Sequence, residues 1–502
     1  MTAFGHAPFI VIWETTRACA LACVHCRAQA IPHRHPGELT TEEGGRLIDR
    51  VAAFGDPPPL LVLTGGDPMR RPDLVELVGH ARRRGVVVSL TPSGTGAATE
   101  ERLRALRDAG LARLAVSLDG ATAEAHDAFR GVRGSHRHTM LILERARRLG
   151  LPLQINTTVC RQTVEGLPAL VPQIEALEPA LWALFFLIPV GRAHAHQALA
   201  ADGIERVLHW AAALAEAAPF AVKTTEAPHY WRVLATRRLL GGPPPAERPR
   251  SGRPAPGGIG RADRAVTDGN GFVFVDHLGQ ICPSGFLPLA VGNVRETDLV
   301  AVYREAPLFR ALRDPARLGG RCGRCEYRER CGGSRARAYA ATGDPLGEDP
   351  GCAYEPGRQG PATGLHPEIA GASDAGAPAD LPSGGRPGIG GGSGGAAGAA
   401  PRTAEAPAPP PAVTPEAVRA ALRTVIDPEL GLSVVELGLV YGLVVEGGTV
   451  RITMTLTAPG CPLHEVMPKW IAESVRPLPG VDAVHVAVVF DPPWTPARIA
   501  VG

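Results

Sequence analysis

From residue 9 to about residue 190, short apolar and β-branched runs alternate with amphipathic helical patterns. A short apolar run is typical of a strand buried on both faces, and strands that alternate with helices predict βα units and a parallel sheet. Six strands, each followed by a helix, predict an α/β fold: an incomplete (β/α)6 TIM-like barrel with its chemistry at the carboxyl ends of the strands. The predicted strands are Phe9–Trp13, Leu60–Thr64, Val86–Leu90, Leu114–Leu118, Pro152–Val159 and Trp182–Ile188.

A capping box marks the start of the first helix. Thr40 stands three residues before Glu43, a spacing at which each side chain can bond the backbone N–H of the other residue. Leu47, Ile48 and Val51 follow at helical spacing and share one face. We therefore expect a helix that begins after Thr40 and packs against the sheet.

The rest of the chain falls into segments of different composition. Residues 271–357 begin with a hairpin pattern and continue as a cysteine-rich, turn-rich sequence, which suits a metal-stapled module because it has few core residues. The stretch from Pro356 to Pro411 is mostly Gly, Ala, Pro and Ser, so it predicts a disordered linker. A helix near Pro415 and alternating strand patterns predict a small C-terminal α/β domain. The predicted segments are 1–220 (partial barrel), 221–270 (bridging segment), 271–357 (cysteine-rich module), 358–412 (linker) and 413–502 (C-terminal domain).

Composition narrows the function classes. A formal net charge of +2, without a basic stripe interleaved with aromatics, gives no indication of nucleic-acid binding. No apolar run reaches the roughly 18 residues of a membrane span, and the N-terminal stretch has no export signal, so we expect a cytoplasmic protein. Lys223 and Lys469 are the only lysines, which we interpret as codon bias toward arginine. The ten cysteines are then metal ligands rather than disulfides.

The first cysteine motif is C-x3-C-x2-C, formed by Cys19, Cys23 and Cys26 directly after the first predicted strand. A cubane [4Fe-4S] cluster has four irons, so three thiolates on one loop leave one iron open to another ligand. The alternative is a zinc site that takes its fourth ligand from a distant residue.

With these cysteines in place, the sequence over residues 9–357 resembles the radical S-adenosylmethionine (SAM) superfamily. The resemblance implies that SAM chelates the open iron and is cleaved reductively to methionine and a 5'-deoxyadenosyl radical, which oxidises the substrate. His25 stands where the family places an aromatic residue beside the cluster. The residues that the resemblance assigns to SAM are Gly65, Gly66, Asp67 and Pro68 after the second strand, Ser117 and Asp119 after the fourth, and Arg130 and Asn156.

A second cysteine set resembles the SPASM module of radical SAM maturases. Cys322, Cys325, Cys331 and Cys352 supply four thiolates, enough to complete one auxiliary [4Fe-4S] cluster. Two cysteines of a full SPASM module are missing, so we expect a single auxiliary cluster, with Cys282 as a spare or alternative ligand. The alternative is a zinc knuckle.

Within that superfamily, the sequence is most similar to enzymes of heme d1 and alternative heme biosynthesis. This implies a tetrapyrrole substrate, with His229, Tyr230 and Arg192 as pocket candidates, and reduced ferredoxin or flavodoxin as electron donor. The alternative is modification of a ribosomally made peptide. The segments that carry the similarity are CEYRERCGGSRARAYAATGD, ICPSGFLPLAVGNVRE, KTTEAPHYWR and FFLIPVGR.

Residues 413–502 resemble the small domain of iron-sulfur cluster assembly factors, through IDPELGLSVVELGLVYG, TLTAPGCP and FDPPWTP. Asp427, Glu429 and Cys461 are its candidate functional residues. Cys461 alone cannot enclose a cluster, so the resemblance implies transient binding and delivery to the attached enzyme. The alternatives are that Cys461 is a small core residue, and that the whole chain is a non-enzymatic cluster carrier or a zinc-organised binding module.

Overall fold

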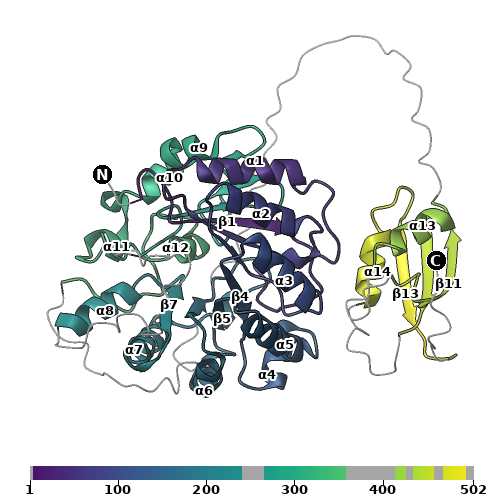
Figure 1. Ribbon diagram of the computed structural model, residues 1–502, viewed down its shortest axis with the longest axis horizontal. Helices are drawn as coiled ribbons and strands as arrows, with labels where there is room; N and C mark the ends of the chain where they lie inside the picture. Colours follow the sequence, from purple (N-terminus) through teal and green to yellow (C-terminus); the bar gives the residue numbers. More distant parts are fainter. Residues whose placement is uncertain (1–3, 240–264, 358–412, 426–432, 457–466, 493–502) are drawn as a thin grey trace, which may run out of the picture. The chain divides into compact units, whose positions relative to one another are not determined.

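The structure is a computed structural model that describes residues 4–239, 265–357, 413–425, 433–456 and 467–492. The chain divides into two compact units, Met1–Ala377 and Pro378–Gly502. In the first unit, parallel strands lie side by side inside a ring of helices (Figure 1), as the sequence predicts. The strands are β1 (Ile10–Thr16), β2 (Leu60–Gly65), β3 (Val88–Leu90), β4 (Arg113–Ser117), β5 (Leu153–Val159), β6 (Leu181–Phe186) and β7 (Ala221–Thr225).

The helices follow the strands in alternation. Thr40 and Glu43 form the expected capping box, and Leu47, Ile48 and Val51 are buried on the inner face of the first helix. The helices of this part are α1 (Thr41–Ala52), α2 (Leu74–Arg83), α3 (Glu100–Ala109), α4 (Ala123–Arg130), α5 (Ser135–Arg148), α6 (Leu167–Leu177), α7 (Ala201–Ala217) and α8 (Tyr230–Leu239).

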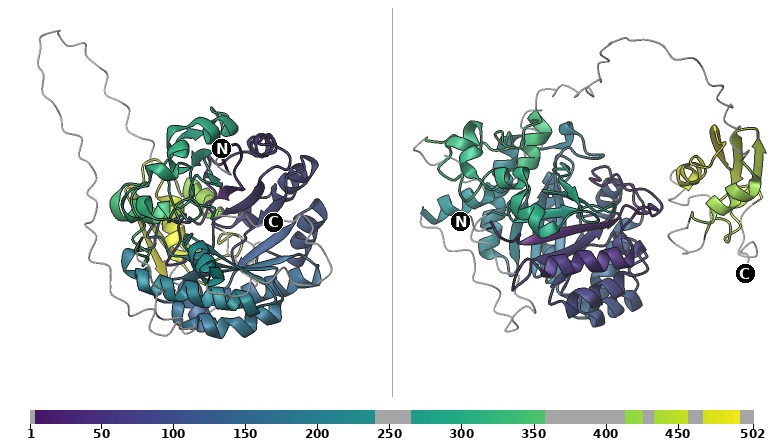
Figure 2. Two further views of the ribbon diagram at one scale, coloured as in Figure 1. Left: turned by 90° about the vertical axis from the view of Figure 1, so that its left-hand side faces the viewer. Right: turned by 90° about the horizontal axis from the view of Figure 1, so that it is seen from above.

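The sheet is longer than the sequence predicts. The order is β10-β9-β8-β1-β2-β3-β4-β5-β6-β7, so β7 continues the barrel past β6, inside the range that we treat as a bridging segment. At the other edge the expected hairpin, β8 (Phe272–Val275) and β9 (Gln280–Cys282), joins the same sheet because β8 pairs with β1 in parallel. The partial barrel and the cysteine-rich module therefore share one sheet, which Figure 2 shows from two further sides.

The cysteine-rich module continues with short elements. They are β10 (Gly292–Asn293), α9 (Leu299–Glu305), α10 (Pro307–Leu312), α11 (Gly320–Arg324) and α12 (Arg335–Thr342).

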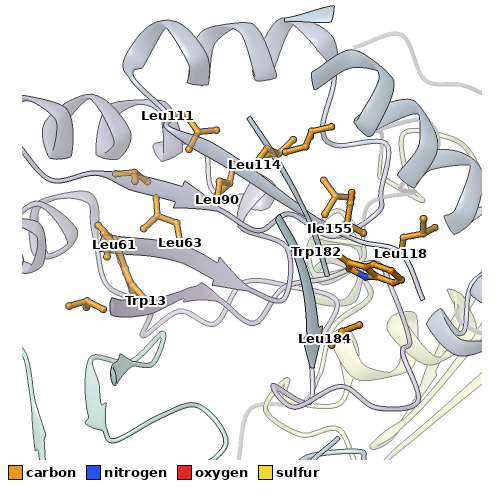
Figure 3. Packing of buried hydrophobic residues seen from close by; sticks show 14 of the residues in the cluster. Trp13, Leu61, Leu63, Leu90, Leu111, Leu114, Leu118, Ile155, Trp182 and Leu184 are labelled. Atoms are coloured by element: carbon orange, nitrogen blue, oxygen red, sulfur yellow. The ribbon is translucent and has the colours of Figure 1, made fainter. Parts of the chain in front are cut away.

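The core lies between the strands and the outer helices. Trp182 is fully buried, and its indole N–H donates to the Thr157 hydroxyl at 2.9 Å, so the ring packs without losing its polar partner. Figure 3 shows this packing, with side chains from neighbouring strands in contact beneath the helices. The labelled residues are Trp13, Leu61, Leu63, Leu90, Leu111, Leu114, Leu118, Ile155, Trp182 and Leu184.

In its described residues, the second unit contains a small sheet of order β11-β12-β13 and the helices α13 and α14. It confirms the α/β domain that the sequence predicts. Its elements are α13 (Pro415–Leu422), β11 (Val440–Glu446), β12 (Thr449–Met454), α14 (Met467–Val475) and β13 (Ala483–Val488). Across the described ranges of both units, no helix is long and apolar enough to cross a membrane.

Candidate active site and iron-sulfur centres

The loop between β1 and α1 carries Cys19, Cys23 and Cys26, and all three line the interior cavity of the barrel. The base of the loop is closed by two backbone hydrogen bonds, from Cys19 N–H to the Ile31 carbonyl at 2.8 Å and from Ile31 N–H to the Arg17 carbonyl at 3.0 Å. Cys19 and Cys23 are buried, and Cys26 is half-buried. The cavity measures about 2340 Å³ and its wall is largely apolar. The three thiols therefore face one open cavity, which extends from the carboxyl end of β1 to the amino ends of the barrel strands.

Each of the three sulfurs has a polar neighbour. Cluster thiolates accept hydrogen bonds, so this donor set fits a bound iron-sulfur cluster. The neighbours are the Ser93 hydroxyl and Leu21 N–H, each 3.3 Å from Cys19 Sγ, Ala30 N–H, 3.4 Å from Cys26 Sγ, and Arg130 Nη1, 3.8 Å from Cys23 Sγ.

Burial keeps the Cys19 and Cys23 thiols protonated in the absence of a metal. It raises the pKa of Cys19 to about 12, and the nearby Asp67 carboxylate acts in the same direction. Burial also raises the pKa of Cys23, while the Arg130 guanidinium opposes the rise. Metal coordination deprotonates a thiol outright, so cluster binding to this loop releases protons.

Gly65 and Gly66 follow β2 and pack directly against the backbone that precedes Cys19. A Cβ at Gly65 would lie 2.2 Å from the Thr16 carbonyl oxygen, and one at Gly66 would lie 2.5 Å from the Ala18 carbonyl oxygen. Both distances are too short for any side chain, so only glycine fits at either position. The backbone of both glycines lines the cavity.

Asp67 and Pro68, which we also assign to SAM from the sequence, occupy different surroundings. The Asp67 carboxylate is fully buried and accepts hydrogen bonds from Met69 N–H at 3.1 Å, Ser93 N–H at 3.3 Å and the Thr95 hydroxyl at 2.7 Å. Pro68 is buried at the start of a short 3₁₀ turn, Pro68–Arg70. The Asp67 carboxylate therefore fastens the glycine loop to the segment after β3.

The carboxyl ends of β4 and β5 bring the remaining SAM candidates together. Ser117 pairs with Asn156 across the two strands, and both line the cavity, as does Arg130. Asp119 is buried, and its carboxylate lies 2.6 Å from Arg130 Nη2 and accepts a 2.6 Å hydrogen bond from Thr158 N–H. Asp119 thus holds Arg130 in place toward the cavity.

His25 lies flat against the ring of Phe129, with ring centroids 4.1 Å apart. Burial and the neighbouring Arg130 lower the pKa of His25 to about 3, so the ring is neutral at ordinary pH. A neutral imidazole in this place covers the cysteine loop as a flat aromatic surface.

The second cysteine set gathers at one small cavity, next to His229, Arg232 and Asp349. Cys322 Sγ has two donors, Arg335 Nη2 at 3.5 Å and Asp349 N–H at 3.4 Å. Burial raises the pKa of Cys352 to about 11 and raises that of Cys331 further. The four cysteines that line this cavity are Cys322, Cys325, Cys331 and Cys352.

Cys282 lies elsewhere, at the end of β9. It pairs with Phe274 of β8, and its charged neighbours are Asp276, Arg27 and Glu14. Burial and the Asp276 carboxylate raise its pKa to about 12. Cys282 is not among the residues that line the second cavity.

The three tetrapyrrole-pocket candidates do not share one site. Tyr230 lines the barrel cavity, and its hydroxyl donates to the Ala211 carbonyl at 3.3 Å. His229 lines the cavity of the four cysteines instead. Arg192 donates its backbone N–H to the Cys26 carbonyl at 3.0 Å, and its guanidinium lies near His25.

Several charged residues that line the barrel cavity are not predicted from the sequence. Arg27 pairs with Glu14 and lies over the Phe274 ring at 4.8 Å, which ties the cysteine loop to β8. Glu226 and Lys223 line the cavity at β7, a strand that the sequence did not predict.

Asp427, Glu429 and Cys461 of the C-terminal domain lie outside the described residues. Within the described ranges, no group of three or more His, Cys, Asp or Glu side chains is arranged to bind a single metal ion.

Comparison with known proteins identifies the class. Residues 13–170 match the radical SAM superfamily and residues 415–488 match the iron-sulfur cluster assembly protein family. The chain belongs to the radical SAM superfamily and is an enzyme, and that family uses a [4Fe-4S] cluster and SAM.

Comparison with individual proteins shows which members of the superfamily this chain is similar to. The chain is 39% identical over 359 residues to the AdoMet-dependent heme synthase of Methanosarcina barkeri, a match that covers 72% of this chain and 100% of that protein. It is 39% identical to the AdoMet-dependent heme synthase of Oleidesulfovibrio alaskensis (70% of this chain, 89% of that one). It is 28% identical to the pre-heme d1 synthase of Dinoroseobacter shibae (71% and 89%).

Solved structures of lower identity share the fold. SuiB of Streptococcus suis bound to S-adenosylmethionine superposes with a TM-score of 0.52 at 14% identity, over 69% of this chain and 75% of that one. The enzyme anSMEcpe with bound AdoMet and a peptide superposes with a TM-score of 0.51 at 16% identity, over 68% and 93%.

Proposed function

We propose that this enzyme cleaves SAM reductively at a cluster held by Cys19, Cys23 and Cys26 and oxidises a tetrapyrrole in heme biosynthesis. The observation that carries the proposal is the barrel cavity, onto which the three thiols and the Gly65–Gly66 loop open together. At about 2340 Å³ it exceeds the roughly 300–1,000 Å³ of a usual ligand pocket, so it has room for SAM beside a large substrate. The identity to heme synthases over their full length supports the tetrapyrrole.

We assign the binding of SAM and the exclusion of water to residues of this chain. When bound, the reduced cluster supplies the electron that splits SAM into methionine and a 5'-deoxyadenosyl radical. The backbone of the glycine loop binds the SAM amino group, and Ser117 and Asn156 bind the ribose side. Asp119 orients Arg130, while the apolar wall excludes water from the radical.

We assign an auxiliary cluster to Cys322, Cys325, Cys331 and Cys352. It would accept the electron that a substrate radical gives up on oxidation and pass it to an external acceptor, while reduced ferredoxin or flavodoxin donates the electron for SAM cleavage. Two observations support the assignment: the four cysteines line one cavity, and the Arg335 guanidinium, 3.5 Å from Cys322 Sγ, can offset part of the negative charge of a cluster with four thiolates.

The decisive experiment measures SAM cleavage. Anaerobically reconstituted protein with SAM and dithionite should form 5'-deoxyadenosine, and Cys23→Ala should not. Cys160→Ala is the matched control, because the Cys160 thiol is buried against the Thr163 hydroxyl and Cys160 lines neither of the two cysteine cavities. If the wild-type protein forms no 5'-deoxyadenosine, the chain is a cluster carrier and the enzymatic proposal fails.

The substrate class is tested separately. Iron coproporphyrin III is the probe, because a further relative, 30% identical, is an Fe-coproporphyrin III synthase of Methanosarcina barkeri. We expect heme as the product by liquid chromatography and mass spectrometry. SAM cleavage without any change of the porphyrin would instead favour a peptide, as for the PqqA peptide cyclase of Rhodopseudomonas palustris, which is 29% identical.

A further inference from the structure

Lys223 lies on the inner wall of the barrel. It is the middle residue of β7, the last strand at this edge of the sheet, and its side chain lines the barrel cavity. The strand register places Lys223 beside Ala183, which pairs with Asn156, which in turn pairs with Ser117. This register connects β7 to β4 through β6 and β5, and Lys223, Asn156 and Ser117 all line the cavity.

Arg113 faces the same cavity from the beginning of β4. It lies two and four residues before Ala115 and Ser117, which also line the cavity, so it points to the interior by the alternation of a strand. Its guanidinium Nε is buried without a hydrogen-bond partner. Lys223 and Arg113 are close enough that the arginine, together with burial, lowers the pKa of Lys223 to about 8.

These two cations lack the partners that other cations of the cavity have. Arg27 is paired with Glu14 and Arg130 with Asp119, whereas within the described ranges neither Lys223 nor Arg113 has an ion pair or a hydrogen bond. Lys223 and Arg113 are both half-buried, so each charge is only partly hydrated and has no counter-charge beside it. Two such charges side by side form a site for an anion that the protein itself does not provide.

The rest of the wall indicates what carries the anion. Phe272 and Phe274 of β8, Phe185 of β6 and Trp231 of α8 line the same cavity. Flat apolar rings favour a flat apolar ligand, and the basic pair favours a ligand with an acidic group at its edge. A tetrapyrrole with carboxylate side chains has both properties.

We propose that Lys223 and Arg113 form a subsite that binds a side-chain carboxylate of the tetrapyrrole substrate. The inference rests on the proposed function, because it assigns a group of the substrate to a place on the barrel wall. Arg113 can bind a carboxylate with two parallel hydrogen bonds, and Lys223 adds a point charge.

The test compares Lys223→Met, which removes the charge, with Lys223→Arg, which keeps it. Binding of iron coproporphyrin III, of its methyl ester and of SAM is measured by absorption titration of the reconstituted protein. We expect Lys223→Met to weaken binding of the porphyrin by about tenfold or more, Lys223→Arg to stay within about threefold of wild type, and SAM affinity to be unchanged. The methyl ester, which has no carboxylate, should bind wild type and Lys223→Met equally.

Each other outcome has a definite meaning. Equal porphyrin affinity in wild type and Lys223→Met overturns the subsite, and a loss of SAM affinity instead assigns the pair to the SAM carboxylate and overturns it as well. If wild type itself fails to bind the porphyrin, the proposed function fails and the subsite with it. Folding is checked by thermal unfolding, where Lys223→Met should melt no lower than wild type because an unpaired half-buried charge is removed.

Discussion

Asp119 and Arg130 form a buried ion pair whose nearest atoms are 2.6 Å apart. The Asp119 side chain is fully buried, while Arg130 retains 12% exposure toward the cavity. The same guanidinium lies 3.8 Å from Cys23 Sγ. The pair therefore links the end of β4 to the cysteine loop, two segments that are far apart in the chain.

Replacing Asp119 with Asn should be strongly destabilising. The substitution leaves Arg130 as a buried charge without its carboxylate, which lowers the free energy of unfolding by about 3 kcal/mol. Urea unfolding of the apo-protein measures the effect. The control is Glu42→Gln, which breaks the exposed Glu42–Arg46 pair and should change the free energy by less than about 1 kcal/mol. Equal losses in the two variants would contradict a structural role for the buried pair.

Gly66→Ala should disrupt the cluster site. The added Cβ would lie 2.5 Å from the carbonyl oxygens of Arg17 and Ala18, and a backbone atom cannot move aside as a flexible side chain can. We expect lower iron content per chain after reconstitution and a lower urea midpoint.

Gly79→Ala is the matched control for this substitution. Gly79 lies in α2, where the nearest atom to a new Cβ is Arg83 Nη1 at 3.5 Å. This variant should keep its iron and gain up to about 1 kcal/mol, because alanine favours a helix over glycine. Loss of iron in both variants would show that the effect does not depend on the cysteine loop.

The sequence predicts the barrel well where its strands are buried on both faces. The β1 to β6 segments are apolar runs, and each lies where it was expected. β7 was missed because it is short and three of its five residues, Lys223, Thr224 and Thr225, are polar, so it lacks the apolar run that reveals its neighbours.

Some site residues could be predicted from the sequence and others could not, as with the strands. Cys19, Cys23 and Cys26 could be found because their spacing is local to one loop. The roles of Asp67 and Asp119 could not be found from the sequence. The residues around each aspartate do not reveal whether its carboxylate faces the cavity or fastens a loop. Contacts such as that of Glu226 with Ser334, 108 residues apart, have no local signature.

Cys282→Ala should leave the iron content unchanged. Cys282 lies at the end of β9 beside Phe274, whereas the four cysteines of the second set line a cavity of their own. Cys331→Ala, which removes one of those four, should lose the auxiliary cluster and about half of the iron if both clusters are cubanes. Iron analysis and electron paramagnetic resonance of the reduced proteins compare the two variants with wild type. Loss of iron from the Cys282→Ala variant would instead identify Cys282 as a cluster ligand.

Glu226→Gln should change how stability depends on pH. Glu226 accepts a 2.6 Å hydrogen bond from the Ser334 hydroxyl, and burial together with the Asp268 carboxylate holds its pKa well above the usual value. A carboxyl group whose pKa is raised in the folded state contributes its full stability below the unfolded pKa, and this is lost as the pH rises through the folded pKa.

The melting temperature of wild type relative to Glu226→Gln should therefore fall as the pH rises above 4.5, the ordinary pKa of a glutamate, through the raised pKa of the folded state. The introduced glutamine amide stays neutral and can still accept a hydrogen bond from Ser334, so the variant lacks this dependence. Parallel melting curves across the range would contradict a raised pKa for Glu226 in the folded protein.

Cys461→Ser in the full chain tests delivery of clusters by the C-terminal domain. That domain matches the iron-sulfur cluster assembly family over residues 415–488, and Cys461 is its one cysteine. A tethered carrier raises the local concentration of cluster near the enzyme, so its loss should slow loading more than it affects the loaded enzyme. We expect the variant purified from cells to hold less iron per chain than wild type, with the same rate of 5'-deoxyadenosine formation per bound cluster. Full iron content combined with a lower rate per cluster would contradict delivery and would place Cys461 in the reaction itself.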